Sequence, residues 1–177
     1  MPHYLALFAL VLAVASTGCS KTPADGSASN DSASGGAPAA ATKPATTTHD
    51  GRAVEITTTD AMKFSVAEIN ARPGEKLSVT LVNLGTTPKF SMGHNWVLIS
   101  PGTDLPQFLQ ASAEAVTTDY VPAGAQKARI LSATRLLGPK ERDTVTFTAP
   151  DTPGRYEFLC SFPGHYQVGM RGVLIVQ

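Results

Sequence analysis

Short runs of alternating apolar and polar residues limit the folds open to the second part of this chain. Residues 76–83 place Leu77, Val79 and Leu81 on one face, and Pro-Gly or Gly-Pro turns separate several such runs. A period of two is typical of half-buried β-strands, and many short strands predict a β-sandwich or barrel. The expected strands comprise residues 54–58, 64–69, 76–83, 96–100, 128–133, 143–148, 155–160 and 172–176.

One segment departs from this pattern. In residues 104–115, Asp104 is suited to cap a helix and Pro106 falls in its first turn. Apolar residues recur at helical spacing, and they are Leu105, Phe108, Leu109 and Ala113. We expect one short amphipathic helix here, inserted between strands and covering the flank of the sandwich.

The first 18 residues have the features of an export signal. Tyr4 to Ala15 form an apolar run of 12 residues, which suits a signal core and is too short to span a bilayer. The following residues, Ser16 to Cys19, resemble the lipobox of bacterial lipoproteins, so we expect a lipid on Cys19. The alternative is ordinary signal cleavage nearby, with Cys19 lost or without a function.

Residues 20–53 contain no Val, Ile, Leu, Met or aromatic residue. Such a composition cannot bury enough apolar surface to offset the entropy of ordering the chain. We therefore predict that residues 19–53 comprise the lipidated Cys19 and a disordered tether with an average span of about 30 Å. The folded domain is expected to comprise residues 54–177.

The chain contains two cysteines, Cys19 and Cys160, on opposite sides of the predicted tether. A disulfide between them would clamp the tether against the domain, and each has a better separate explanation. An unpaired thiol in an exported domain requires a purpose, and metal ligation supplies one.

Cys160, His165 and Met170 lie on one short segment, and His94 provides a second imidazole far upstream. Two His, one Cys and a weakly bound Met form the ligand set of blue-copper electron-transfer sites. We therefore expect one copper ion, alternating between Cu(I) and Cu(II), at one end of the sandwich. Gln167 is an alternative axial ligand, because an amide oxygen also takes that position.

Neighbours of these ligands have expected roles as well. The backbone amides of Asn95 and Phe162 are placed to hydrogen-bond the Cys160 sulfur and so raise the reduction potential. The side chains of Asn95 and Ser161 are placed to bridge the two ligand segments. Gly93 removes side-chain bulk where its backbone carbonyl would approach the metal.

Residues 88–98 and 160–165 resemble azurins, as do Asp119-Tyr120, residues 134–138 and residues 143–147. The resemblance implies a cupredoxin-type Greek-key β-sandwich of eight strands that binds one copper atom. It implies His94, Cys160 and His165 as equatorial ligands, with Met170 and the Gly93 carbonyl in axial positions. The lipobox and linker are similar to those of lipid-modified azurins. Four residues separate His165 from Met170, as in auracyanin and rusticyanin, whereas azurin has three.

The predicted surface of the domain fits transient protein partners. An apolar rim around His165 is expected from Met62, Met92, Phe162 and Pro163. The charge is balanced, with 14 basic and 14 acidic residues, so nothing indicates nucleic-acid binding. A small apolar rim on a protein of balanced charge suits weak redox encounters with cytochrome, oxidase or reductase proteins. No small-molecule substrate is expected.

These features favour a one-electron carrier at the periplasmic face of the inner or outer membrane. A copper enzyme would need several further imidazoles, and only His3 and His49 remain, so we expect no enzymatic activity. The alternative is a periplasmic copper-storage or delivery protein. That class usually exposes several Met or His ligands on flexible segments, and the predicted tether has one His and no Met.

Overall fold

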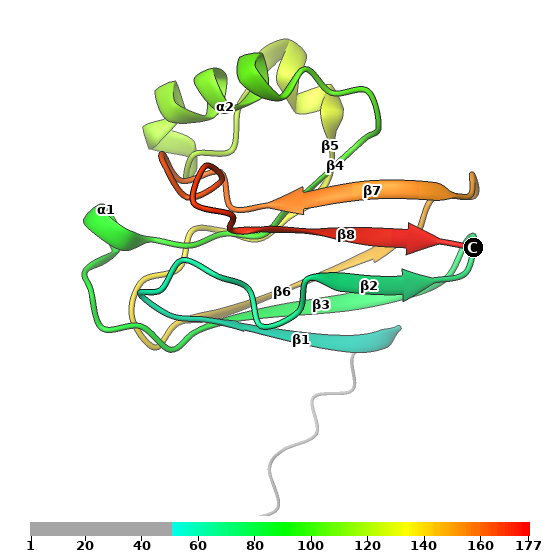
Figure 1. The fold of residues 1–177 in the computed structure, drawn as a ribbon, viewed down its shortest axis with the longest axis horizontal. Helices are drawn as coiled ribbons and strands as arrows, with labels where there is room; N and C mark the ends of the chain where they lie inside the picture. The colour runs from blue at the N-terminus through cyan, green and yellow to red at the C-terminus, as the bar shows by residue number, and fades with distance from the viewer. Residues whose placement is uncertain (1–50) are drawn as a thin grey trace, which may run out of the picture. The chain divides into compact units, whose positions relative to one another are not determined.

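The computed structural model describes residues 51–177, which fold into two β-sheets (Figure 1). The predictions for the export signal, Cys19 and residues 19–50 of the tether lie outside the described residues. The strands are β1 (Arg52–Thr58), β2 (Glu68–Ala71), β3 (Lys76–Asn83), β4 (Val97–Ile99), β5 (Ile130–Ala133), β6 (Arg142–Thr148), β7 (Gly154–Leu159) and β8 (Arg171–Val176). The helices are α1 (Lys89–Met92) and α2 (Leu105–Glu114), with 3-10 segments η1 (Val116–Thr118) and η2 (Gly124–Arg129).

Within residues 51–177 one sheet has the strand order β1-β3-β6, and the other has the order β2-β8-β7-β4-β5. The pairs β1–β3 and β2–β8 are parallel, and the remaining pairs are antiparallel. Strands that follow one another in sequence often lie in different sheets, so the chain passes repeatedly between the two layers. The prediction of an eight-stranded β-sandwich is confirmed.

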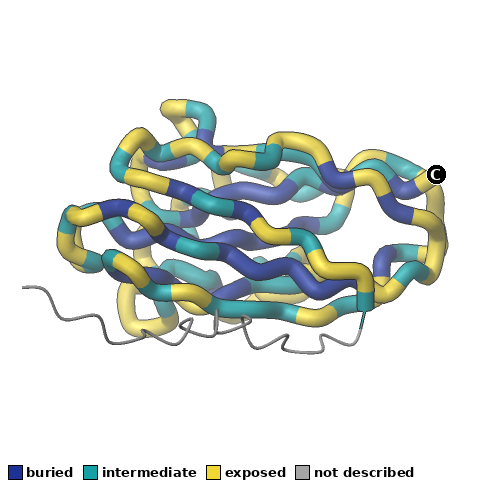
Figure 2. The backbone as a smooth tube through the Cα atoms, turned by 90° about the horizontal axis from the view of Figure 1, so that it is seen from below, coloured by how far each residue is buried: buried dark blue, intermediate teal, exposed yellow. Residues whose placement is uncertain are grey.

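The main core lies between the two sheets. Leu77, Val79 and Leu81 of β3 are fully buried there, as the alternation predicted. The Trp96 ring packs 5.6 Å from that of Phe158, measured between ring centroids. Figure 2 shows buried residues concentrated along the strands and exposed residues in the connections. Burial of such large side chains stabilises the fold by about 1.5–3 kcal/mol each.

A second apolar cluster lies on the outer face of the five-stranded sheet, where α2 covers it (Figure 1). Phe108 of α2 is fully buried against Val97, Ile99 and Leu159. The Asp104 side chain caps the helix by accepting a hydrogen bond from the backbone amide of Gln107. The predicted flanking helix is therefore confirmed, within one residue at each end.

The strand predicted at residues 64–69 is wrong in position, because β2 spans Glu68–Ala71. Met62 adopts a positive φ of 54°, which turns the chain away from an extended path. Phe64 forms only an isolated bridge with Thr58. A single helix was expected, so α1 is a further difference. Its turn closes when the Ser91 and Met92 amides donate to the Pro88 carbonyl.

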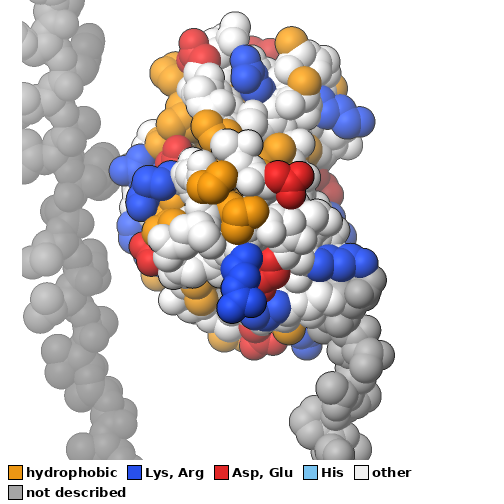
Figure 3. Space-filling model, turned by 90° about the vertical axis from the view of Figure 1, so that its right-hand side faces the viewer, with side chains coloured by type: hydrophobic (Ala, Val, Ile, Leu, Met, Phe, Trp, Pro, Cys, Tyr) orange, Lys and Arg blue, Asp and Glu red, His pale blue; other side chains and the backbone are white. Residues whose placement is uncertain are grey.

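The two ends of the sandwich differ in what they carry. Strand β7 runs toward the end that holds α1 and the loop between Cys160 and Met170 (Figure 1). The opposite end carries the C-terminus and is seen in Figure 3, where acidic and basic side chains are interspersed with apolar ones. No helix in residues 51–177 has the length and apolar character needed to cross a bilayer.

Candidate metal centre

Three buried side chains, His94, Cys160 and His165, converge at the end of the sandwich, and their ligand atoms all lie within 4.8 Å of one another. The Nδ1 atoms of His94 and His165 are 3.2 Å apart, and the Cys160 Sγ lies 3.4 Å from His165 Nδ1. Three ligands bound to one ion at 2.0–2.3 Å would be separated by roughly 3.5 Å in a trigonal plane. The arrangement therefore fits a single metal ion.

The sheets bring these residues together from distant parts of the chain. Cys160 directly follows β7, and its amide donates to the carbonyl of Met170, the residue before β8 (3.1 Å). His94 precedes β4 and forms a two-way backbone bridge with Leu137, at 3.1 Å and 2.7 Å. Cys160 and His94 are consequently held beside paired strands, whereas His165 lies on the loop that joins β7 to β8.

Burial controls the protonation of all three groups. It raises the pKa of the Cys160 thiol to about 12, although hydrogen bonds from the backbone amides of Asn95 and Phe162 oppose this. Burial lowers the pKa of His165 to about 4, with a smaller contribution from His94, and burial also lowers the pKa of His94. Near pH 7 both imidazoles are neutral and available as donors, whereas the thiolate requires a nearby cation.

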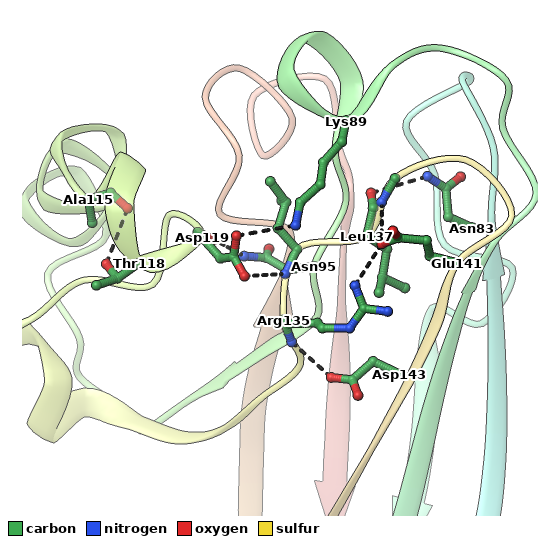
Figure 4. Close-up of polar contacts among 12 residues, drawn as sticks. Asn83, Lys89, Asn95, Ala115, Thr118, Asp119, Arg135, Leu137, Glu141 and Asp143 are labelled. Atoms are coloured by element: carbon green, nitrogen blue, oxygen red, sulfur yellow. Dashed lines mark hydrogen bonds and ion pairs between the residues drawn. The ribbon is translucent and has the colours of Figure 1, made fainter.

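Asn95 joins the His94 segment to two others. Its Nδ2 donates to the Ser161 hydroxyl (2.8 Å) and to the Asp119 carbonyl (3.0 Å), and Ser161 Oγ donates to the Tyr120 carbonyl (2.7 Å). Figure 4 shows Asp119 beside Asn95, with Lys89 approaching its carboxylate. Asp119 and Tyr120 both have positive φ, which aims their carbonyls at this network. Neither residue had a predicted role, since only their resemblance to azurin marked them.

A family model for copper binding proteins of the plastocyanin/azurin family matches residues 52–177. The chain belongs to this family. It is 35% identical over 127 residues to an azurin from Pseudomonas chlororaphis, covering 70% of this chain and 97% of that protein. It is 35% identical to the outer membrane protein H.8 of Neisseria gonorrhoeae, covering 64% of this chain and 61% of that protein.

Among solved structures, a dithionite-reduced auracyanin from Roseiflexus castenholzii superposes with a TM-score of 0.59 at 34% identity. The alignment covers 71% of this chain and 96% of the auracyanin. The fold is therefore that of an azurin-like cupredoxin, and the cofactor is copper at a single site. The donor set of two imidazoles and one thiol agrees with that cofactor.

The two candidate axial side chains of this cupredoxin differ in burial. Met170 is completely buried beside the site, whereas Gln167 is exposed and lines a surface hollow between α2 and the ligand loop. At Gly93 a Cβ atom would lie 2.7 Å from both a Leu136 methyl group and the Lys89 carbonyl. The close contact with Leu136 and Lys89 therefore explains why glycine precedes His94.

The residues predicted to form an apolar rim all reach the surface of the domain. The residues predicted to form the rim are half-buried or exposed, namely Met62, Met92, Phe162 and Pro163. Phe90 was not among the predicted rim residues, although it is 83% exposed on α1 and lines a hollow of about 340 Å³ together with Val116 and Tyr120. Its polar neighbours Lys89 and Ser91 were the available sign that it faces solvent.

Proposed function

We propose that this cupredoxin carries single electrons between redox proteins in the bacterial cell envelope. His94, Cys160 and His165 would hold the copper, with Met170 and the Gly93 carbonyl as weaker donors. The convergence of the three buried ligand atoms carries the proposal. Copper bound to such a ligand set supplies a Cu(II)/Cu(I) couple suited to electron transfer.

The protein part of the site is suited to this task. Because the three ligands are buried and held by hydrogen bonds to neighbouring strands and loops, their geometry should change little when an electron moves. The amides of Asn95 and Phe162 withdraw electron density from the Cys160 sulfur, which favours the reduced state and raises the reduction potential. A rigid site with a tuned potential exchanges electrons without large rearrangement.

Electrons are proposed to pass through the edge of His165. The Phe162 ring lies 4.6 Å from the His165 ring between centroids, and the Tyr120 ring lies 4.8 Å from that of Phe162. The apolar rim, extended by Phe90, would exclude water when a partner docks. Small apolar contacts permit the brief encounters that redox carriers require.

The alternatives are less well supported by the site. A storage or delivery protein has to release its metal, whereas His94 and Cys160 are fully buried and His165 is 3% exposed. An enzyme would need an open coordination position and a substrate cavity. Within residues 51–177 the three candidate ligands form one compact cluster, and we propose no catalytic activity.

The cell-envelope location rests on the N-terminal sequence. Residues 1–18 are proposed to direct export, and a lipid on Cys19 would anchor the domain through its tether. The outer membrane protein H.8 bears a name that agrees with such a location. Expression of the full chain tests this: wild type should fractionate with membranes and Cys19→Ala should be soluble, whereas a soluble wild type would refute the anchor.

Stopped-flow mixing of the copper-loaded protein with a soluble c-type cytochrome tests electron carriage. Visible absorption should bleach on reduction and return fully on oxidation, over repeated cycles. Phe90→Ser should slow the bimolecular rate, whereas Leu131→Ser, which removes a 41% exposed apolar side chain on β5, should not. Absence of reversible bleaching would overturn the proposed function.

A further inference from the structure

The loop that carries three of the proposed ligands is fastened at its middle by Tyr166. The Tyr166 hydroxyl donates a hydrogen bond to Glu157 Oε1 (3.1 Å) and accepts one from Arg171 Nη1 (2.7 Å). The Arg171 guanidinium also lies over the Tyr166 ring, 4.8 Å from its centroid. A cation over an aromatic face adds to the attraction between these two side chains.

The Tyr166 ring is part of the apolar cluster beneath α2. It packs against the group formed by Val97, Ile99, Phe108 and Leu159 on the outer face of the five-stranded sheet. Glu157 belongs to β7, three residues before Cys160, and Arg171 begins β8 directly after Met170. The loop is therefore tied at its midpoint to the two strands from which it starts and to which it returns.

Backbone hydrogen bonds transmit this attachment to the proposed ligands. The Tyr166 carbonyl accepts from the Gly169 amide (2.9 Å), and the His165 carbonyl accepts from the Met170 amide (2.9 Å). Movement of Tyr166 would consequently shift His165 on one side and Met170 on the other. On the far side of the loop, the ammonium group of Lys63 donates to the Val168 carbonyl.

We propose that Tyr166, held by Glu157 and Arg171, is a positioning residue that fixes His165 and Met170 relative to Cys160. The inference rests on the proposed function, because it concerns how the same site is tuned. Glu157 and Arg171 carry opposite charges and add no net charge beside the loop, and the proposed effect acts through geometry. A loosened loop would permit the tetragonal geometry that Cu(II) prefers, which lowers the reduction potential.

Two substitutions test this inference in the full chain. Tyr166→Phe keeps the packed ring and removes both hydroxyl contacts, and Tyr166→Ala removes the ring as well. Tyr156→Phe is the matched control, since the Tyr156 hydroxyl donates to the Thr152 carbonyl (2.7 Å) near the start of β7, at the other end of the sandwich. Tyr156→Phe loses one part-buried hydroxyl contact away from the ligand loop, so it shows what the loss of a tyrosine hydroxyl does elsewhere in the domain.

In the copper-loaded protein, Tyr166→Phe should lower the reduction potential and change the visible and EPR spectra, with larger changes in Tyr166→Ala. Tyr156→Phe should leave all three measurements at the wild-type values. In the metal-free protein, hydrogen exchange at the Gly169 amide should accelerate about tenfold in Tyr166→Phe, because the loss of about 1.4 kcal/mol of local stability corresponds to that factor.

The inference is overturned if Tyr166→Phe matches Tyr156→Phe in potential, spectra and Gly169 exchange. Should Tyr166→Ala fail to fold, Tyr166→Phe decides alone. Failure of wild type to cycle reversibly would refute the proposed function instead. In that case the exchange measurement on metal-free protein still decides whether Tyr166 positions the loop.

Discussion

Asn95 and Ser161 form a reciprocal hydrogen-bonded pair between the two segments that carry the proposed ligands. Asn95 Oδ1 accepts from the Ser161 amide (2.9 Å), while Asn95 Nδ2 donates to Ser161 Oγ (2.8 Å). Both residues are buried. The pair therefore couples the position of His94 to that of Cys160.

Asn95→Ala should lower the free energy of unfolding of the metal-free protein by about 2–4 kcal/mol. It removes buried hydrogen bonds and leaves the Ser161 amide without this acceptor, and a buried unsatisfied group is costly. Urea denaturation measures the change. The control Asn70→Ala removes an exposed side chain that donates to Glu68 and should change stability by less than about 0.5 kcal/mol. Equal effects at the two positions would contradict the account.

Gly93→Ala should destabilise the domain by about 1–3 kcal/mol, because the new methyl group must displace Leu136 or the Lys89 carbonyl. The displacement should also move His94 and alter the visible spectrum of the copper form. Gly154→Ala provides the comparison, since its nearest neighbour would be 3.7 Å away and ordinary contact results. Denaturation curves and spectra of both variants check this, and an unperturbed Gly93→Ala spectrum would argue against the expected close packing.

Metal binding at pH 7.5 should release close to one proton. The pKa of Cys160 is raised to about 12, so its thiol is protonated before binding, whereas the pKa of His165 is lowered to about 4 and its ring is already neutral. Titration calorimetry counts the released protons when it is repeated in buffers of different ionisation enthalpy. Zn²⁺ is used as the metal because it is redox-inert. Cys160→Ser should release none. Zero release from wild type would show that the thiolate is not a ligand.

Met170→Gln should retain copper and lower the reduction potential. An amide oxygen stabilises Cu(II) more than a thioether does, and the axial ligand tunes the potential of such sites. Gln167→Met, at the exposed neighbouring position, should leave the potential unchanged. Voltammetry of the two variants distinguishes them. A shift in Gln167→Met without one in Met170→Gln would assign the axial position to residue 167.

The periodicity of the sequence predicted which residues are buried better than it predicted which strands pair. Strand β3 has the predicted bounds, Lys76–Asn83, because its apolar face and flanking turns are both encoded locally. Phe64 and Val66 also pack against the core as their alternation indicated, yet they do not belong to a named strand. Pairing depends on a partner strand elsewhere in the chain, which local alternation does not encode.

The candidate site was predictable where its residues share a short motif. Cys160 and His165 lie on one loop, but their approach to His94 depends on the sandwich topology and on its bridge to Leu137. The contacts of Tyr166 with Glu157 and Arg171 join one loop to two strands. Only the three-dimensional fold places such residues together, so sequence patterns did not single them out.

The visible spectrum of the copper-loaded protein, compared with that of Cys160→Ser, tests the central claim most directly. The thiolate–copper bond should give wild type an intense visible band that ascorbate bleaches, because electron density is shared across that bond. Cys160→Ser should be folded and lack this band. A wild-type protein that binds Cu(II) without the band, or a Cys160→Ser protein that retains it, would contradict the account.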